Sequence, residues 1–151
     1  MKKIACAAVL AGVVGLTGAG VAWAEDYEVH MLNRGAEGAM VFEPAFLEVQ
    51  PGDTVTFLPT NPSHNAETIS SMLPEGAEPF RGALNQAVTV TFDEEGLYGI
   101  KCAPHYAAGM IVLIEVGDGE TVNGEAARAA RHPGLARRRM SALFDQLDAN
   151  Q

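Results

Sequence analysis

The chain has 151 residues, the length of a single domain, and 48% of them are hydrophobic. Acidic residues outnumber basic ones by 19 to 10, which gives a formal net charge of −9 at pH 7. Nucleic-acid binding depends on neutralising phosphates with Lys and Arg, so this composition argues against a nucleic-acid partner.

The chain begins with the pattern of a cleaved secretion signal. A start with two lysines precedes an apolar run over 4–21, and Ala22-Trp23-Ala24 fits a small-x-small cleavage site. The alternative is an N-terminal membrane anchor, but no stop-transfer flank follows. The sequence therefore predicts a signal peptide at 1–24 and a periplasmic domain at 25–151, with no membrane insertion of the mature chain.

Cleavage changes both the charge and the cysteine content. Loss of Lys2 and Lys3 leaves 8 basic residues against 19 acidic ones, a net charge of −11. Cys6 leaves with the signal, so Cys102 is the one cysteine of the mature chain and no internal disulfide can form. An odd cysteine in an exported protein indicates a free thiol, an intermolecular bond or a metal ligand.

Residues 25–117 have the pattern of short strands separated by turns. Tyr27, Val29 and Met31 alternate with more polar neighbours, as expected for a strand with one buried face. Further strands are predicted at 46–49, 54–58, 87–92, 97–101 and 109–116, and an irregular crossing loop at 69–86. Seven to eight short strands of this kind predict an all-β fold, an antiparallel sandwich.

Candidate metal ligands follow the predicted strand at 97–101. Cys102, His105 and Met110 share one short loop, and His64 lies upstream. A thiolate, two imidazoles and a thioether are the ligands of a blue-copper electron-transfer site, in which the Met is a weak axial ligand. The alternatives are a buried free cysteine, a Met110 that only fills the core, and a Cys–His nucleophile pair. The last lacks an evident orienting Asn or Asp and an oxyanion loop.

The loop Cys102–Met110, together with His64-Asn65 upstream, resembles the cupredoxins and, within them, the pseudoazurin family. The resemblance extends to Tyr27–Asn33, Gly38–Pro44, Pro51–Phe57 and Leu97–Cys102. It implies a Greek-key β-sandwich that binds one type 1 copper per chain and carries electrons without catalysing a reaction.

The resemblance also implies roles for two residues beside the ligands. The backbone N–H of Asn65 is expected to point at the Cys102 sulfur, and its side chain to bond the residue after the Cys. Family members usually have a hydroxyl residue there, so Ala103 suggests that one loop-to-loop hydrogen bond is missing. Met40 is expected over the ring of His105.

The C-terminal tail changes to a helical period, with helices expected over about 123–148. Asn123 is a candidate N-cap for a helix from Gly124 to about Arg131. A second helix, at about 135–147, carries an apolar stripe that should pack on the sandwich. Pseudoazurins share two such helices. Arg137-Arg-Arg139 is either a solvated helix face or a docking patch.

Together these observations predict a soluble, monomeric, periplasmic blue-copper protein that passes single electrons between redox proteins. A copper nitrite reductase, a cytochrome c or an oxidase are plausible partners. The alternatives are a copper storage or delivery protein and a Cys-dependent hydrolase. Pseudoazurins surround the exposed His with lysines, but here only Lys101, Arg34 and Arg81 are candidates. We therefore expect weak steering toward an acidic partner.

Overall fold

A computed structural model describes residues 23–151, and nearly all of the predicted signal peptide lies outside this range. The strands are β1 (Asp26–Gly35), β2 (Gly38–Glu43), β3 (Phe46–Val49), β4 (Asp53–Leu58), β5 (Glu67–Thr68), β6 (Val88–Phe92), β7 (Gly96–Lys101) and β8 (Ile111–Val116). The helices are α1 (Gly119–Ala129) and α2 (Gly134–Asn150), with short 3-10 turns η1 (Ser70–Met72) and η2 (Ala103–His105). Across residues 23–151, no helix is long and apolar enough to cross a membrane.

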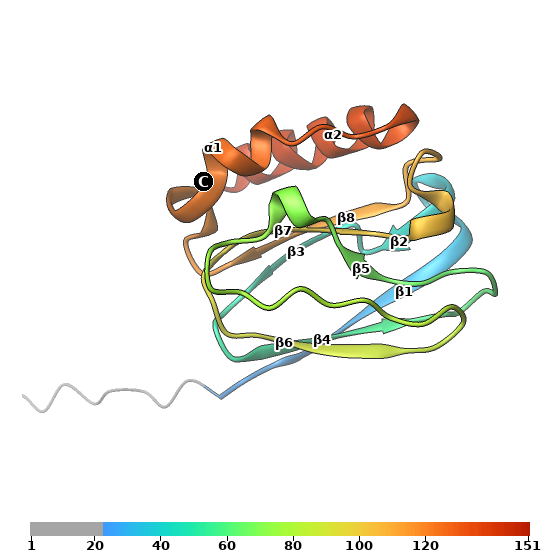
Figure 1. Ribbon diagram of the computed structural model, residues 1–151, viewed down its shortest axis with the longest axis horizontal. Coiled ribbons are helices and arrows are strands. Elements are labelled where there is room, and N and C mark those ends of the chain that lie inside the picture. Colours follow the sequence, from blue (N-terminus) through green and yellow to red (C-terminus); the bar gives the residue numbers. More distant parts are fainter. Residues whose placement is uncertain (1–22) are drawn as a thin grey trace, which may run out of the picture.

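The strands form two four-stranded sheets that face each other, which confirms the predicted sandwich (Figure 1). One sheet has the order β2-β1-β4-β6 and the other β3-β8-β7-β5. The sheets are mixed rather than purely antiparallel, because β1 pairs with β4, and β3 with β8, in parallel. The chain crosses to the second sheet for β3 before it returns as β4, and this crossover brings β4 beside β1 in the same direction.

Alternating side chains fill the space between the sheets. Val29 and Met31 of β1 are fully buried there, with Phe57 of β4 and Ile100 of β7. Cys102, the residue after β7, belongs to the same cluster. The predicted period-2 pattern thus aims the candidate thiolate into the core at one end of the sandwich.

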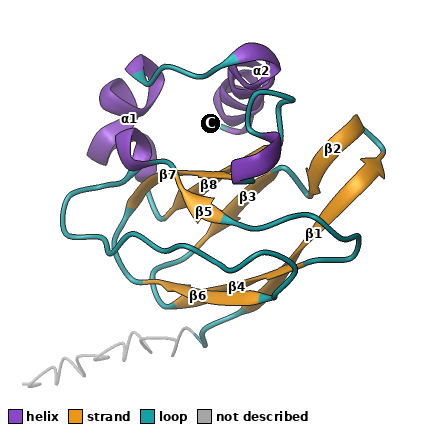
Figure 2. Ribbon diagram, turned by 45° about the vertical axis from the view of Figure 1, so that its right-hand side comes forward, coloured by secondary structure: helices purple, strands orange, loops and turns teal. Residues whose placement is uncertain are grey.

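The two helices form a third layer over the sheet that contains β7 and β8 (Figure 2). Leu97 of β7 and Leu113 of β8 point outward and pack under Met140, Phe144 and Leu147 of α2. Both faces of these strands are therefore buried, which explains why residues 111–116 form a nearly continuous apolar run, broken by Glu115, rather than an alternation.

The two helices occupy a wider range than the sequence predicted. α1 begins at Gly119, before Asn123, and is interrupted at Asn123, whose φ is −141°. A helical segment does begin at Gly124, after the non-helical Asn123, as the sequence predicted. The expected side-chain cap is wrong: the side-chain oxygen of Asn123 accepts a hydrogen bond from Leu97 N–H at 2.7 Å, and its amide donates to Leu97 O at 3.0 Å. Asn123 therefore satisfies the first residues of β7 instead of the helix end.

The packing of α2 yields a stability prediction. Leu147 of α2 is fully buried against the sheet, whereas Leu135 on the same helix is 54% exposed. We expect Leu147→Ala to lower the free energy of unfolding by about 2–5 kcal/mol, and Leu135→Ala to change it by about 0.5 kcal/mol or less. Denaturant unfolding of both variants measures this difference. Equal losses would show that α2 is not packed as described.

Candidate metal centre

The candidate ligands lie on two loops at one end of the sandwich, the right-hand end in Figure 1. His64 lies between β4 and β5, and Cys102, His105 and Met110 lie between β7 and β8. The second loop closes on itself: Cys102 N–H donates to Met110 O at 3.0 Å and Met110 N–H donates to His105 O at 3.2 Å. The short spacing noted in the sequence thus forms a compact hydrogen-bonded turn.

Three donor atoms from these loops meet at one point. His64 Nδ1 lies 3.1 Å from His105 Nδ1, and Cys102 Sγ lies 3.7 Å from His64 Nδ1 and 3.6 Å from His105 Nδ1. A triangle with these sides has its centre about 2 Å from each corner, close to the roughly 2.0–2.3 Å bonds that imidazole and thiolate make to first-row metal ions. The three side chains can therefore share one ion.

The ring of His64 is held from behind by Asn33 of β1. The side-chain oxygen of Asn33 lies 2.8 Å from His64 Nε2. Because an amide oxygen only accepts, Nε2 carries the proton and Nδ1 presents its lone pair to the triangle. Burial, and secondarily the charge of His105, lowers the pKa of His64, which keeps the imidazole neutral as a metal ligand requires. The sequence analysis missed Asn33.

Cys102 is fully buried, and burial raises the pKa of its thiol. Backbone hydrogen bonds from Asn65 and His105 oppose this rise, and the carboxylate of Glu67 adds to it. A buried thiol with a raised pKa is a poor nucleophile, whereas a bound cation would deprotonate it. The environment of Cys102 thus suits a metal ligand and disfavours the hydrolase alternative.

Asn65 joins the two loops. Its Oδ1 accepts a hydrogen bond from Ala103 N–H at 2.8 Å, and its amide donates to Glu67 and to Gly82 O, each at 3.2 Å. The expectation that Ala103 removes the loop-to-loop bond is therefore wrong. The bond uses the backbone N–H of residue 103, which every residue except proline provides.

Met110, a further predicted site residue, lies in the same hydrophobic cluster as Cys102, and Met40 packs against that cluster. Met110 is fully buried. Met40 is half-buried and has a φ of 52°, an unusual backbone conformation for a side chain of its size. Met110 is therefore held beside Cys102, to which its carbonyl is also hydrogen-bonded.

Several polar contacts around the ligand loop were not predicted. Glu67 forms ion pairs with Arg81 at 3.1 Å and with Lys101 at 3.4 Å. The hydroxyl of Tyr106, next to His105, lies 2.7 Å from Nδ1 of His132 in the segment between the helices. These pairs join residues far apart in sequence, so no spacing pattern could reveal them.

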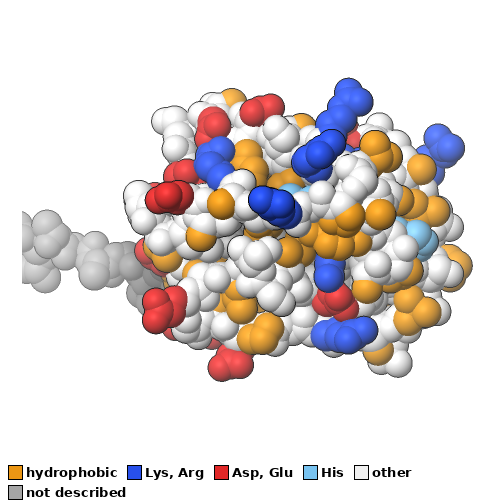
Figure 3. Space-filling view, turned by 45° about the horizontal axis from the view of Figure 1, so that its top comes forward, with side chains coloured by type: hydrophobic (Ala, Val, Ile, Leu, Met, Phe, Trp, Pro, Cys, Tyr) orange, Lys and Arg blue, Asp and Glu red, His pale blue; other side chains and the backbone are white. Residues whose placement is uncertain are grey.

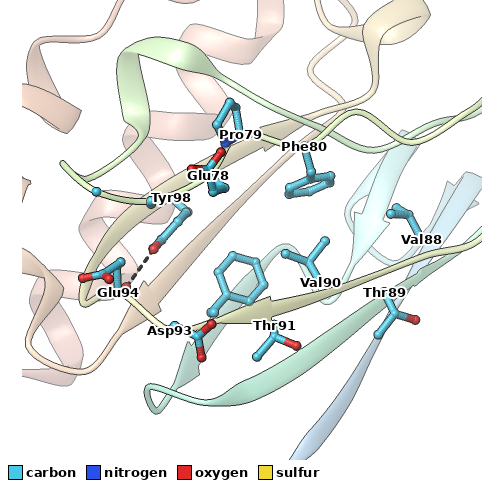
Figure 4. Close-up of a pocket in the computed structure, with 13 residues that line it drawn as sticks. Glu78, Pro79, Phe80, Val88, Thr89, Val90, Thr91, Asp93, Glu94 and Tyr98 are labelled. Atoms are coloured by element: carbon cyan, nitrogen blue, oxygen red, sulfur yellow. Dashed lines mark hydrogen bonds between the residues drawn. The ribbon is translucent and has the colours of Figure 1, made fainter.

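A cavity of about 500 Å³ lies away from these donors, between the segment 76–80 and β6 (Figure 4). Val88, Val90 and Phe80 form its apolar wall, and Glu78 and Glu94 stand at its rim. Its lining contains no thiol, imidazole or thioether, so it does not belong to the candidate metal centre.

Comparisons with known proteins agree with this geometry. Residues 29–117 match the family of copper binding proteins described as the plastocyanin/azurin family. The pseudoazurin of Paracoccus pantotrophus is 48% identical over 142 residues, covering 94% of this chain and 96% of that protein.

Solved structures give the same result. The pseudoazurin of Methylobacterium extorquens AM1 has a TM-score of 0.78 and 47% identity, covering 81% of this chain and 98% of that one. The pseudoazurin of Sinorhizobium meliloti has a TM-score of 0.80 and 40% identity, and the match covers 84% of this chain and 99% of that one. The predicted copper cofactor and Greek-key fold are thus confirmed, and the chain belongs to the plastocyanin/azurin family of copper-binding electron carriers and, within it, to the pseudoazurins.

Proposed function

We propose that this protein is a periplasmic, monomeric one-copper electron carrier in which His64, Cys102 and His105 hold the metal and Met110 is its weak axial ligand. The observation that carries the proposal is the triangle of three donor atoms with sides of 3.1, 3.6 and 3.7 Å. Bound copper supplies the Cu(II)/Cu(I) couple, and one thiolate with two imidazoles and a thioether suits both oxidation states. Residues 1–24 serve as the export signal.

The residues of the chain hold this donor set in place and limit its access to solvent. His64 and Cys102 are fully buried, and His105 is half-buried, so His105 alone of the three brings a ring edge toward the surface. Asn33 and Asn65 fix the two loops from behind. We propose that electrons enter and leave through the outer edge of His105.

The surface around His105 suits brief contact with another protein. Ala103, Pro104 and Ala107 of the same loop are exposed, and Met40 is half-buried. Hydrophobic side chains gather at the right-hand end of Figure 3, the end at which Figure 1 places this loop. An apolar contact patch of modest size allows a partner to approach closely and to leave quickly.

The charges are separated along the molecule. The exposed acidic side chains of Asp93–Glu95 lie at the end opposite the ligand loop, where β7 begins. Arg137 and Arg138 are exposed on the first turns of α2, which contact the ligand loop through Leu135 N–H and Ala107 O at 2.9 Å. In Figure 3 most of the visible Asp and Glu side chains lie toward the left. Net charge therefore understates the basic character of the ligand end.

The first prediction from this proposal concerns Cys102. Cys102→Ala removes the sulfur whose charge transfer to copper gives the intense blue colour, so the visible band should be lost. The apolar faces of the strands are untouched, so circular dichroism should show a folded sandwich. Absorption spectra after copper addition make the test. A variant that keeps the band would refute the ligand assignment, and a wild-type protein that binds copper with weak or no colour would favour a delivery protein.

The second prediction concerns the axial position. Met110→Gln replaces a soft thioether with a harder oxygen donor that stabilises Cu(II), so the reduction potential should fall while one copper is retained. Voltammetry and metal analysis measure both quantities. If copper is retained and the potential stays at the wild-type value, Met110 is a core residue and not a ligand.

The third prediction concerns docking. The net charge led us to expect weak steering toward an acidic partner, but the placement of the charges predicts a stronger attraction. Exposed arginines near the ligand loop should attract an acidic redox partner, such as a nitrite reductase with an acidic rim, and salt should weaken this attraction. The double variant Arg137→Ala/Arg138→Ala should lower the transfer rate at low salt by about tenfold and flatten its salt dependence.

Stopped-flow rates across ionic strength test this, with Asp93→Asn/Glu94→Gln as the control. This control changes the net charge by two units, as the arginine variant does, but in the opposite direction and at the opposite end of the molecule. It should leave the rate near wild type. If it raises the rate toward the acidic partner as much as Arg137→Ala/Arg138→Ala lowers it, net charge and not local placement governs the approach.

A further inference from the structure

Arg139 of α2 contacts both segments that border the metal centre. Its Nη1 donates to Met40 O at 2.8 Å and to Gly109 O at 2.9 Å, and its Nη2 donates to Ala39 O at 2.9 Å. One guanidinium thus satisfies three backbone carbonyls, two in the β1–β2 hairpin and one in the ligand loop. The planar guanidinium can make several directed bonds at once, which an ammonium group cannot.

The two contacted segments both carry residues next to the buried ligands Cys102 and Met110 in the sequence or in the core. Met40 packs against the hydrophobic cluster that contains Cys102 and Met110, and Gly109 directly precedes Met110. The backbone of Met40 has a φ of 52°, which costs free energy unless its surroundings hold it. The bond from Arg139 to Met40 O supplies such a restraint.

Gly109 is fitted to the side chain of Arg139. Its φ of +91° favours glycine, and a Cβ at this position would lie 2.8 Å from Arg139 Cδ and 3.1 Å from Arg139 Nε. The backbone of the ligand loop therefore approaches the arginine side chain more closely than any residue with a side chain would allow. The next residues on the helix differ: Arg137 and Arg138 are exposed, whereas Arg139 is half-buried.

We propose that Arg139 is a positioning residue of the copper site, which fixes Met40 and the Gly109–Met110 backbone relative to Cys102 and His105. This inference rests on the proposed ligand assignment. Outer residues that orient ligands affect metal affinity by about 10–100-fold when they are removed. α2 is therefore part of the metal centre and does more than cover the sandwich.

The test compares Arg139→Met, Arg139→Lys and the control Arg138→Met. In the metal-free protein, the backbone amides of Gly109 and Met110 should exchange with solvent at least tenfold faster in Arg139→Met than in Arg138→Met. In the copper-loaded protein, Arg139→Met should bind copper roughly tenfold more weakly, with a changed charge-transfer spectrum and a shifted reduction potential. Arg139→Lys keeps the positive charge but lacks the planar guanidinium whose two nitrogens donate to three carbonyls. It should therefore resemble Arg139→Met more than wild type.

A purely structural role gives a different result. Arg139→Met and Arg139→Lys would then lower only the unfolding free energy, with amide exchange of Met110, copper affinity, spectrum and potential equal to those of Arg138→Met, and the inference would be overturned. The exchange measurement needs no copper, so it tests Arg139 even if wild type lacks an intense blue band. A wild-type protein without an intense blue band would refute the proposed function, but not the restraint of the ligand loop by Arg139.

Discussion

The geometry of the donor triangle depends on one contact between two loops, the hydrogen bond from Ala103 N–H to Asn65 Oδ1. His64 precedes Asn65, and Cys102 precedes Ala103, so this bond joins the residues that directly follow the two buried donors. The pairing of β5 with β7, Glu67 beside Lys101, brings the two loops together just beyond the donors. The bond between Asn65 and Ala103 extends this linkage to the residues next to the donors themselves. Ligand positions set before the metal binds leave little reorganisation for electron transfer.

The outer layer of helices supports the same geometry from the opposite side. Leu135 N–H donates to Ala107 O, and Gly134 approaches the same carbonyl so closely that a Cβ would overlap it. Tyr106 meets His132, and Arg139 meets Gly109. Each contact fixes a point on the ligand loop, so the loop is held between the sandwich and the helices and is not a free surface turn.

The sequence predicted the parts of the molecule that local patterns encode. Period-2 alternation located β1, and the closely spaced Cys102, His105 and Met110 identified the metal loop, because local spacing alone brings such donors together. Contacts between distant segments left no such pattern. Asn33 behind His64 and Arg139 across the ligand loop are polar residues in a strand and a helix, where solvent exposure is the usual expectation. Asn123 was interpreted as a helix cap because the residue that its side chain actually bonds, Leu97, is distant in sequence.

Crystal structures of the metal-free and copper-loaded protein test the central claim most directly. If the chain itself sets the site, the bond between Asn65 and Ala103 is present in both. The atoms His64 Nδ1, His105 Nδ1 and Cys102 Sγ then keep their separations to within about 0.5 Å, with one copper at the centre of the triangle. A metal-free structure in which the two loops separate and the Asn65–Ala103 bond is broken would contradict this account, as would copper bound away from Cys102.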